Sequence, residues 1–169
     1  MVTACGSKEM TGPLTVYTGP LMETTNVRTL FSDSARLKLI LTAPLEQNFE
    51  NGDAIYPKGM KVTFFASDGK TVMNTLTANY GKVDKGKNLY IMRGRVNVAN
   101  VPNQQVMKTE ELFLDRNKQL IYTEPKMAVE VATPAERLTG FGLTANQDFS
   151  RYRITKPSGI FALDPGKQP

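Results

Sequence analysis

The sequence predicts an all-β protein built from repeated hairpins. Residues 77–94 and residues 108–124 each read as a strand, a polar turn and a second strand, and at an offset of 31 residues Asp, Lys and Leu recur at the same places around each turn. A period in the range of about 20–50 residues indicates one supersecondary unit laid down several times. No stretch keeps the apolar spacing of an amphipathic helix over three turns. A sandwich, a jelly roll or an open-ended repeat stack fits this pattern.

The composition limits the number of domains and the partners of the chain. With 169 residues the chain has the length of one ordinary domain, and no apolar run approaches the roughly 18 residues that a membrane-spanning helix needs. The formal net charge of +5 favours anionic partners, although a solubilised surface gives the same balance. Nucleic acid is not expected as a partner, because the chain has no run of Lys and Arg and no RNA-binding or helix-turn-helix motif.

The N-terminal residues 1–26 are rich in Thr, Gly, Pro and Ser and predict a linker or anchor region. Within them, Val2-Thr3-Ala4-Cys5-Gly6-Ser7 is typical of the end of a bacterial lipoprotein signal. We therefore expect Cys5 to be lipidated; the alternative is an unremarkable cysteine near a terminus. Because Cys5 is the only cysteine, no internal disulfide is possible.

The first part of the predicted sheet begins with an alternating strand over residues 34–43, which stops at Pro44. A second strand is predicted over residues 59–65 and a third over residues 71–80. Between them, the Asp68-Gly69 dipeptide favours a type I′ turn, because both central residues can adopt a positive φ.

The later part of the chain continues the pattern. Residues 89–98 alternate between an apolar and a polar face, which suits a sheet with one wet side. Further strands are expected over residues 105–114, 119–124, 127–131, 137–145 and 150–155. The chain is thus expected to contain about ten short strands.

One face of the predicted strands is apolar. If these faces pack together, the residues that meet inside are Phe64, Leu76, Ala78, Tyr90, Met92, Val96, Val98, Val129 and Leu143. On pattern alone they form a closed, dry core. They can instead line a binding cavity if the two sheets stay far enough apart to admit acyl chains.

Catalytic and metal sites are not expected. The chain has no histidine, which excludes Ser-His-Asp and Cys-His arrangements. Glu110 and Glu111 form the densest acidic spot, but adjacent strand residues point to opposite faces and cannot act on one substrate. Asp84 and Asp115 occupy the repeated turns, where a carboxylate caps backbone N–H groups. Gly140-Phe141-Gly142 has no helix behind it to bind phosphate and marks a bend or a close backbone approach.

Several short motifs, taken in order and spacing, point to a known family. Among them are Leu30-Phe31-Ser32-Asp33-Ser34-Ala35-Arg36-Leu37, Leu76-Thr77-Ala78-Asn79-Tyr80, Asn88-Leu89-Tyr90-Ile91-Met92-Arg93-Gly94-Arg95-Val96 and Leu138-Thr139-Gly140-Phe141-Gly142-Leu143-Thr144-Ala145-Asn146. Together they resemble the LptC family of lipopolysaccharide-export proteins. The resemblance implies an incomplete, open-ended β-jelly roll over residues 27–160, followed by a C-terminal tail over residues 161–169.

The resemblance also implies a function that is not enzymatic and needs no cofactor. Such a protein works in the periplasm, where it receives lipopolysaccharide from an inner-membrane ABC transporter, shelters the acyl chains in an apolar trough and passes them to an LptA-like bridge protein. The N-terminal edge, carried here by Leu37, Leu39 and Leu41, would dock on the transporter. The C-terminal edge, which would dock on the bridge, is carried by Gly140, Gly142, Tyr152 and Ile154.

The chain departs from the family in its anchor. Better-known members begin with a transmembrane helix, whereas Cys5 predicts a lipid tether to the inner membrane. Unpaired sheet edges template strand addition, so edge-to-edge self-association is a further expectation. Basic residues near the rim, which could meet phosphates, are Arg93, Arg95, Arg137, Arg151 and Arg153. A structural or adhesive β-sandwich lipoprotein with a closed core remains the alternative.

Overall fold

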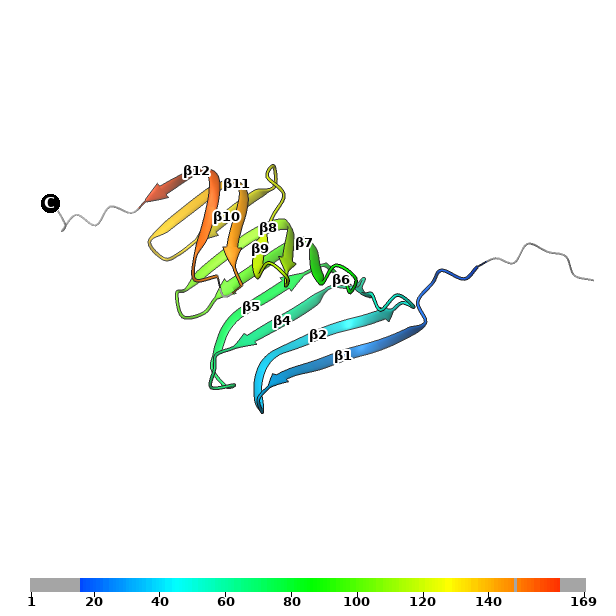
Figure 1. Cartoon of the computed structure of the whole chain (residues 1–169). Helices are drawn as coiled ribbons and strands as arrows, with labels where there is room; N and C mark the ends of the chain where they lie inside the picture. Colours follow the sequence, from blue (N-terminus) through cyan, green and yellow to red (C-terminus); the bar gives the residue numbers. More distant parts are fainter. Residues whose placement is uncertain (1–15, 148, 162–169) are drawn as a thin grey trace, which may run out of the picture.

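The computed structural model describes residues 16–147 and 149–161. Its twelve strands form one antiparallel sheet that is not closed into a barrel, as in an open jelly roll. Figure 1 shows the first strand at one end of the sheet and the last strand at the other. The prediction of an all-β, open-ended fold is confirmed.

The strands follow one another with short connections. Their bounds are β1 (Met22–Asp33), β2 (Arg36–Asn48), β3 (Ala54–Tyr56), β4 (Met60–Phe65), β5 (Val72–Ala78), β6 (Tyr80–Asp84), β7 (Leu89–Asn100), β8 (Gln105–Asp115), β9 (Leu120–Tyr122), β10 (Ala128–Ala132), β11 (Glu136–Asn146) and β12 (Tyr152–Phe161).

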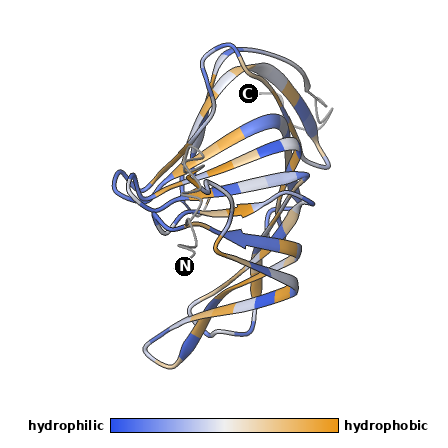
Figure 2. Cartoon of the chain, turned by 90° about the vertical axis from the view of Figure 1, so that its right-hand side faces the viewer, coloured by the Kyte–Doolittle hydropathy of each residue, from blue (hydrophilic) through white to orange (hydrophobic). Residues whose placement is uncertain are grey.

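Most strands form because their apolar residues recur at every second position. In β5, Leu76 and Ala78 are buried, and in β7, Val96 and Val98 are buried on either side of the less buried Asn97. Successive strand residues point to opposite faces, so this period gives each strand one apolar side. Figure 2 shows the resulting alternation of apolar and polar segments along the strands.

The sheet folds into two layers because its long strands change partners midway. In β7, residues 89–93 pair with β6, whereas residues 97–100 pair with β5. Likewise, β8 and β11 each pair with β10 along one half and with β9 along the other. The strand β2 likewise pairs with β4 along one part and with β3 along the other, and β1 and β12 follow their neighbours β2 and β11 through both parts. The first layer therefore contains β4, β5 and β10 with one part of each of β1, β2, β7, β8, β11 and β12. The second layer contains β3, β6 and β9 with the other parts of these six strands. We call the apolar sides that face each other the inner face.

Backbone irregularities mark the corner, where the long strands pass from one layer to the other. In β7 the corner lies at Gly94 and Arg95, which have φ of 74° and 46° beside a register shift against β8. In β11, Gly142 has a φ of 70°, and a Cβ on Gly140 would stand 2.4 Å from Cγ2 of Ile154. The predicted bend or close approach at these glycines is confirmed.

The two repeated turns share one hydrogen bond and one ion pair. An Oδ1 atom of Asp84 accepts the backbone N–H of Lys87 at 3.0 Å, and Oδ1 of Asp115 accepts that of Lys118 at 3.0 Å. Each lysine also forms an ion pair with its aspartate. The aspartates therefore cap local backbone groups, as the sequence predicts.

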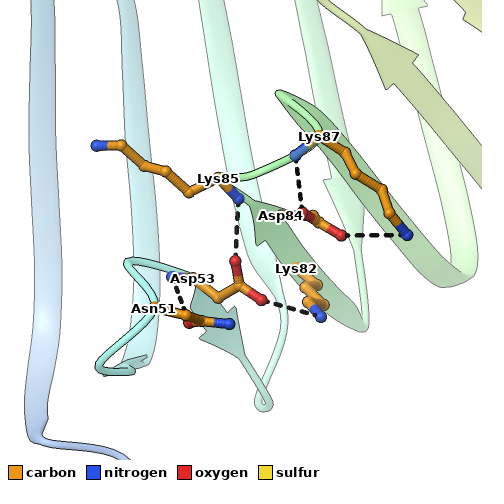
Figure 3. Close-up of polar contacts among 6 residues, drawn as sticks. All are labelled: Asn51, Asp53, Lys82, Asp84, Lys85 and Lys87. Atoms are coloured by element: carbon orange, nitrogen blue, oxygen red, sulfur yellow. Dashed lines mark hydrogen bonds and ion pairs between the residues drawn. The ribbon is translucent and has the colours of Figure 1, made fainter.

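A buried carboxylate ties the β2–β3 connection to the first of these turns (Figure 3). Oδ1 of Asp53 accepts the backbone N–H of Lys85 at 3.0 Å, and its Oδ2 lies 3.2 Å from Nζ of Lys82. The backbone N–H of Asp53 in turn donates to Oδ1 of Asn51 at 2.9 Å. Three chain segments are therefore held together around one side chain.

Four expectations about the strands are wrong. The strand that is expected to stop at Pro44 continues through it as part of β2 and ends at Asn48. The first strand is β1, which begins at Met22, and the chain turns at Ser34 and Ala35, where the sequence predicts a strand. These two residues have φ of 51° and 60°, the signs of a type I′ turn. At Asp68-Gly69 only the glycine has a positive φ, so that turn is not type I′. Residues 16–147 and 149–161 also form twelve strands instead of about ten.

Candidate functional site

The inner face contains all nine apolar residues that the sequence places inside. Seven are buried in a single cluster, and two are partly buried against it: Leu76, Ala78, Met92, Val96, Val98, Val129 and Leu143, with Phe64 and Tyr90 at its margin. The cluster continues with Met107, Leu112, Val131 and Ala145, which the same period-two pattern could have identified. The strands thus bring these side chains together; that they bind a ligand remains a prediction.

The two layers are closed on each other in this conformation. The cavity between them measures only about 10 Å³. It is lined mainly by Val98, Met107, Val131, Leu143, Phe149 and Tyr152. Such a space holds at most about one water molecule. An acyl chain can enter here only if the layers separate.

Two aromatic residues of the second layer close the inner face at its C-terminal end. Phe149 is buried, although its neighbours in the β11–β12 connection are polar and the sequence pattern gives no sign of it. Tyr152 lines the same cavity and shares a hydrogen bond with Gln105 of the first layer. Burial, followed by the charge of Glu136, raises the pKa of the Tyr152 phenol. The phenol therefore stays protonated and links the layers at neutral pH.

The N-terminal end of the inner face is more accessible. Strand pairing places Phe31 of β1 beside Leu39 of β2, and Leu39 beside Phe64 of β4. Leu39 and Phe64 are only partly buried, and Phe31 is 48% exposed. These three apolar side chains, in adjacent strands, thus form a partly exposed margin of the buried core. We call it the open margin.

The predicted N-terminal edge lies on the wrong strand. Leu37, Leu39 and Leu41 belong to β2, which pairs with β1 on one side and with β4 on the other. Among the strands that the structure describes, the free edge at this end is β1, which pairs only with β2. The sequence misses this because only Val27 is buried in β1.

The residues predicted for the C-terminal edge divide between two strands. Tyr152 and Ile154 lie in β12, which pairs only with β11 among the described strands, but their side chains pack towards the core. Gly140 and Gly142 lie one strand further in, at the corner of β11. Whether this end docks a partner remains a prediction.

The basic residues predicted at the rim have different surroundings. Arg93 forms an ion pair with Glu111 across β7 and β8, and Arg137 lies 3.9 Å from Glu130. Arg95 sits at the corner of β7, in a hollow of about 780 Å³ on the outer side of the sheet. Of these three, only Arg95 has no ion-pair partner within the described part of the chain.

The predicted acidic pair is engaged with β7. Glu111 bonds to the Arg93 side chain, while the Glu110 carboxylate accepts the backbone N–H of Arg95 at 3.1 Å. Residues 16–147 and 149–161 contain no cluster of three His, Cys, Asp or Glu side chains arranged to hold a metal. The same residues contain no helix long and apolar enough to cross a membrane. Cys5, the predicted lipidation site, lies outside the described residues.

Comparison with known proteins identifies the family. No individual curated protein matches the chain. The family described as lipopolysaccharide-assembly, LptC-related matches residues 21–156, which include β1 to β11 and the first half of β12. Proteins of this family serve lipopolysaccharide assembly and transport at the cell envelope and are transport components rather than enzymes. The open two-layered sheet and the matched sequence agree, and the chain belongs to the LptC-related family.

Proposed function

We propose that the protein carries the acyl chains of lipopolysaccharide on its inner face. It would receive them from an inner-membrane ABC transporter and pass them to an LptA-like periplasmic bridge protein. The observation that carries this proposal is the continuous apolar cluster between two layers whose strands are continuous at one corner. Acyl chains crossing an aqueous compartment need such a surface, because each methylene group removed from water contributes about 0.8 kcal/mol.

Transfer requires the layers to part, because the cavity of about 10 Å³ leaves no room for an acyl chain. The open margin at Phe31, Leu39 and Phe64 is the natural place for this to begin, since these residues are incompletely covered. Opening would then progress towards Phe149 and Tyr152. In the protein without lipid, the apolar side chains of the two layers contact each other. Each bound acyl chain would replace some of these contacts.

The two free edges support docking at opposite ends of the sheet. β1 and β12 each leave one side without a partner among the described strands, and such edges accept strands from other proteins. We assign the transporter contact to β1 in place of β2, and the bridge contact to β12. Pairing between the edge strands of two copies would use the same backbone N–H and C=O groups. It would therefore compete with both partners.

A closed structural or adhesive β-sandwich is the second candidate, and the small inner cavity favours it. The two functions differ in whether lipid reaches the inner face. A photo-crosslinking amino acid at Phe64 should capture lipopolysaccharide when transporter and ATP are present. The same group at Thr63, the preceding residue, points to the outer side of β4 and serves as the matched control.

Capture at Phe64 that depends on ATP and is absent at Thr63 would support transport. Failure of capture at both Phe64 and the deeper Val129, with the transporter active, would leave the closed sandwich as the better explanation. Both outcomes are read from the same gel shift of the crosslinked protein.

We further propose a periplasmic location with a lipid tether at Cys5. Its motif, Val2 to Ser7, supports the proposal. Mass spectrometry of the protein from membranes should then find acyl groups on Cys5, and Cys5→Ser should release the protein into the soluble fraction. An unmodified Cys5 in the membrane-bound protein would exclude the tether.

A further inference from the structure

The outer side of the first layer carries a polar row that crosses it from one edge. Strand pairing places Arg28 of β1 beside Thr42 of β2, and Thr42 beside Lys61 of β4. Lys61 lies in turn beside Thr77 of β5. Each of the four residues stands next to buried residues in its strand, so its side chain points away from the inner face.

The row continues to the opposite edge. Asn97 of β7 pairs with Thr77 and lies beside Lys108 of β8. Lys108 lies beside Glu130 of β10, and Glu130 beside Thr139 of β11. Thr139 pairs with Ser158 of β12. One residue from every strand of the first layer therefore stands in a single line.

Two hollows follow this line along the corner. One of about 750 Å³ extends from β1 to β5, and one of about 780 Å³ extends from β7 to β12. Their ends lie near each other, because the backbone N–H of Asn79, which lines the first hollow, donates at 2.9 Å to the carbonyl oxygen of Gly94, the residue before Arg95 of the second hollow. We call the two hollows together the outer groove.

Six basic side chains line the outer groove, beside apolar surface. Its basic residues are Arg28, Lys58, Lys61, Arg95, Lys108 and Lys156, all exposed and without an ion-pair partner in the described part of the chain. Of its two acidic residues, Glu130 is paired with Arg137, and Glu110 accepts the backbone N–H of Arg95. The positive charge of the groove is therefore largely uncompensated, and it attracts anions.

We propose that the outer groove binds a negatively charged saccharide chain. Resting on the transport function proposed above, this chain is the phosphorylated saccharide of lipopolysaccharide. The spaced cations suit phosphate and carboxylate groups through charge-assisted hydrogen bonds. The hydroxyl and amide side chains between them offer the donors and acceptors that sugar hydroxyl groups need. Strands lie about 4.8 Å apart, so the row spans roughly 40 Å, which fits an extended chain better than a single headgroup.

Other anions fit the outer groove less well. A flat membrane surface cannot enter two hollows. An acidic peptide that binds by strand pairing needs an unpaired strand, and the groove offers one only at its two ends, in β1 and β12. The groove and the inner face lie on opposite sides of the same layer. A saccharide can therefore reach the groove without passing through the inner face.

The test uses lipopolysaccharide from which the acyl chains have been removed, because this probe cannot use the inner face. The groove variant combines Lys61→Gln, Lys108→Gln and Lys156→Gln. The control variant removes the same charge from exposed lysines outside the groove, with Lys70→Gln, Lys85→Gln and Lys126→Gln. Calorimetry should show at least about tenfold weaker binding for the groove variant and less than about a twofold change for the control. The dephosphorylated saccharide should bind the unaltered protein comparably weakly.

Equal losses in the groove and control variants would overturn the proposal, because they would show a general charge effect. Equal competition by a poly-glutamate peptide would also overturn it, in favour of a protein partner. Crosslinking at Phe64 separates this proposal from the transport function. The groove variant should keep that crosslink, and loss of the crosslink in otherwise unaltered protein would contradict transport while leaving the binding of an acidic saccharide intact.

Discussion

The two glycines at the corner of β11 are required for different reasons. Gly142 has a positive φ, whereas Gly140 is in close contact with β12. A Cβ on Gly140 would stand 2.4 Å from the Ile154 side chain and 3.1 Å from the carbonyl oxygens of Thr155 and Lys156. Gly86, in the first repeated turn, offers the contrast, because the nearest atom to its Cβ position is 3.7 Å away. Gly140 and Gly86 therefore have different structural roles.

Gly140→Ala is expected to lower the free energy of unfolding by about 1–3 kcal/mol, because β12 must shift to admit the methyl group. Gly86→Ala, the matched control, should change it by less than about 0.5 kcal/mol. Urea denaturation measures both values. Similar losses at the two sites would contradict the steric explanation.

The Asp53 carboxylate predicts a pH effect on stability. Burial alone would raise the pKa of this carboxyl group. The hydrogen bond from the backbone N–H of Lys85 and the ammonium group of Lys82 lower the pKa by more than burial raises it, so the pKa lies below its ordinary value of 3.8. A lowered pKa means that the charged form stabilises the fold above the unfolded pKa and that this contribution is lost as pH falls. Asp53→Asn should therefore cost about 1 kcal/mol at neutral pH. In urea denaturation this difference should shrink below about pH 4; a constant difference would count against the ionic role.

At the scale of elements, the repeated turns differ at a position whose backbone is left-handed in both. Asn88 and Gln119 occupy equivalent positions, with φ of 54° and 53°. Asn tolerates this left-handed conformation better than Gln, because its short side chain can bond to nearby backbone. The second turn therefore carries more strain than the first.

Gln119→Asn, which copies the first turn into the second, should raise the free energy of unfolding by about 0.5 kcal/mol. The reverse change, Asn88→Gln, should lower it by more, since Nδ2 of Asn88 also donates to Oδ1 of Asn117 at 2.9 Å. Thermal unfolding of both variants tests the pair. A loss of stability in Gln119→Asn would show that the turns are not equivalent.

Sequence alternation predicted the strands that bury one side, and it failed where a strand buries almost nothing. β7 is recognisable because Val96 and Val98 alternate with polar residues. In β1 only Val27 is buried, so pairing with β2 creates a strand that its own sequence does not signal. The Ser34–Ala35 turn was missed for a related reason, because its positive φ values occur without glycine.

On the scale of the molecule, the nine inner residues could be predicted because the period of two depends on the chain alone. The outer groove could not, since its row follows from strand register across the layer, which tertiary pairing decides. Arg28 and Ser158, for example, lie at opposite ends of the row and are linked only through intervening strands. The closure of the inner face was also hidden, because it depends on Phe149 in a polar connection.

Phe149→Ala should distinguish a lipid carrier from a closed sandwich. Truncation of a buried Phe is expected to cost about 3–5 kcal/mol and to enlarge the inner cavity. In a carrier, the variant should bind a fluorescent fatty acid more tightly than the unaltered protein, at a temperature where both are folded. Val101→Ala, an exposed residue, serves as the control. Destabilisation without added binding would favour the closed sandwich.

The free strands β1 and β12 are unlike in sequence and lie at opposite ends of the sheet. Contact between copies through them would join one end to a different end, and such head-to-tail contacts build filaments that do not close. A partner bound at either strand would then act as a cap that stops growth. With a different protein bound at each end of the sheet, no free edge strand would be left for polymerisation. Binding of its two partners would therefore prevent the protein from assembling with copies of itself.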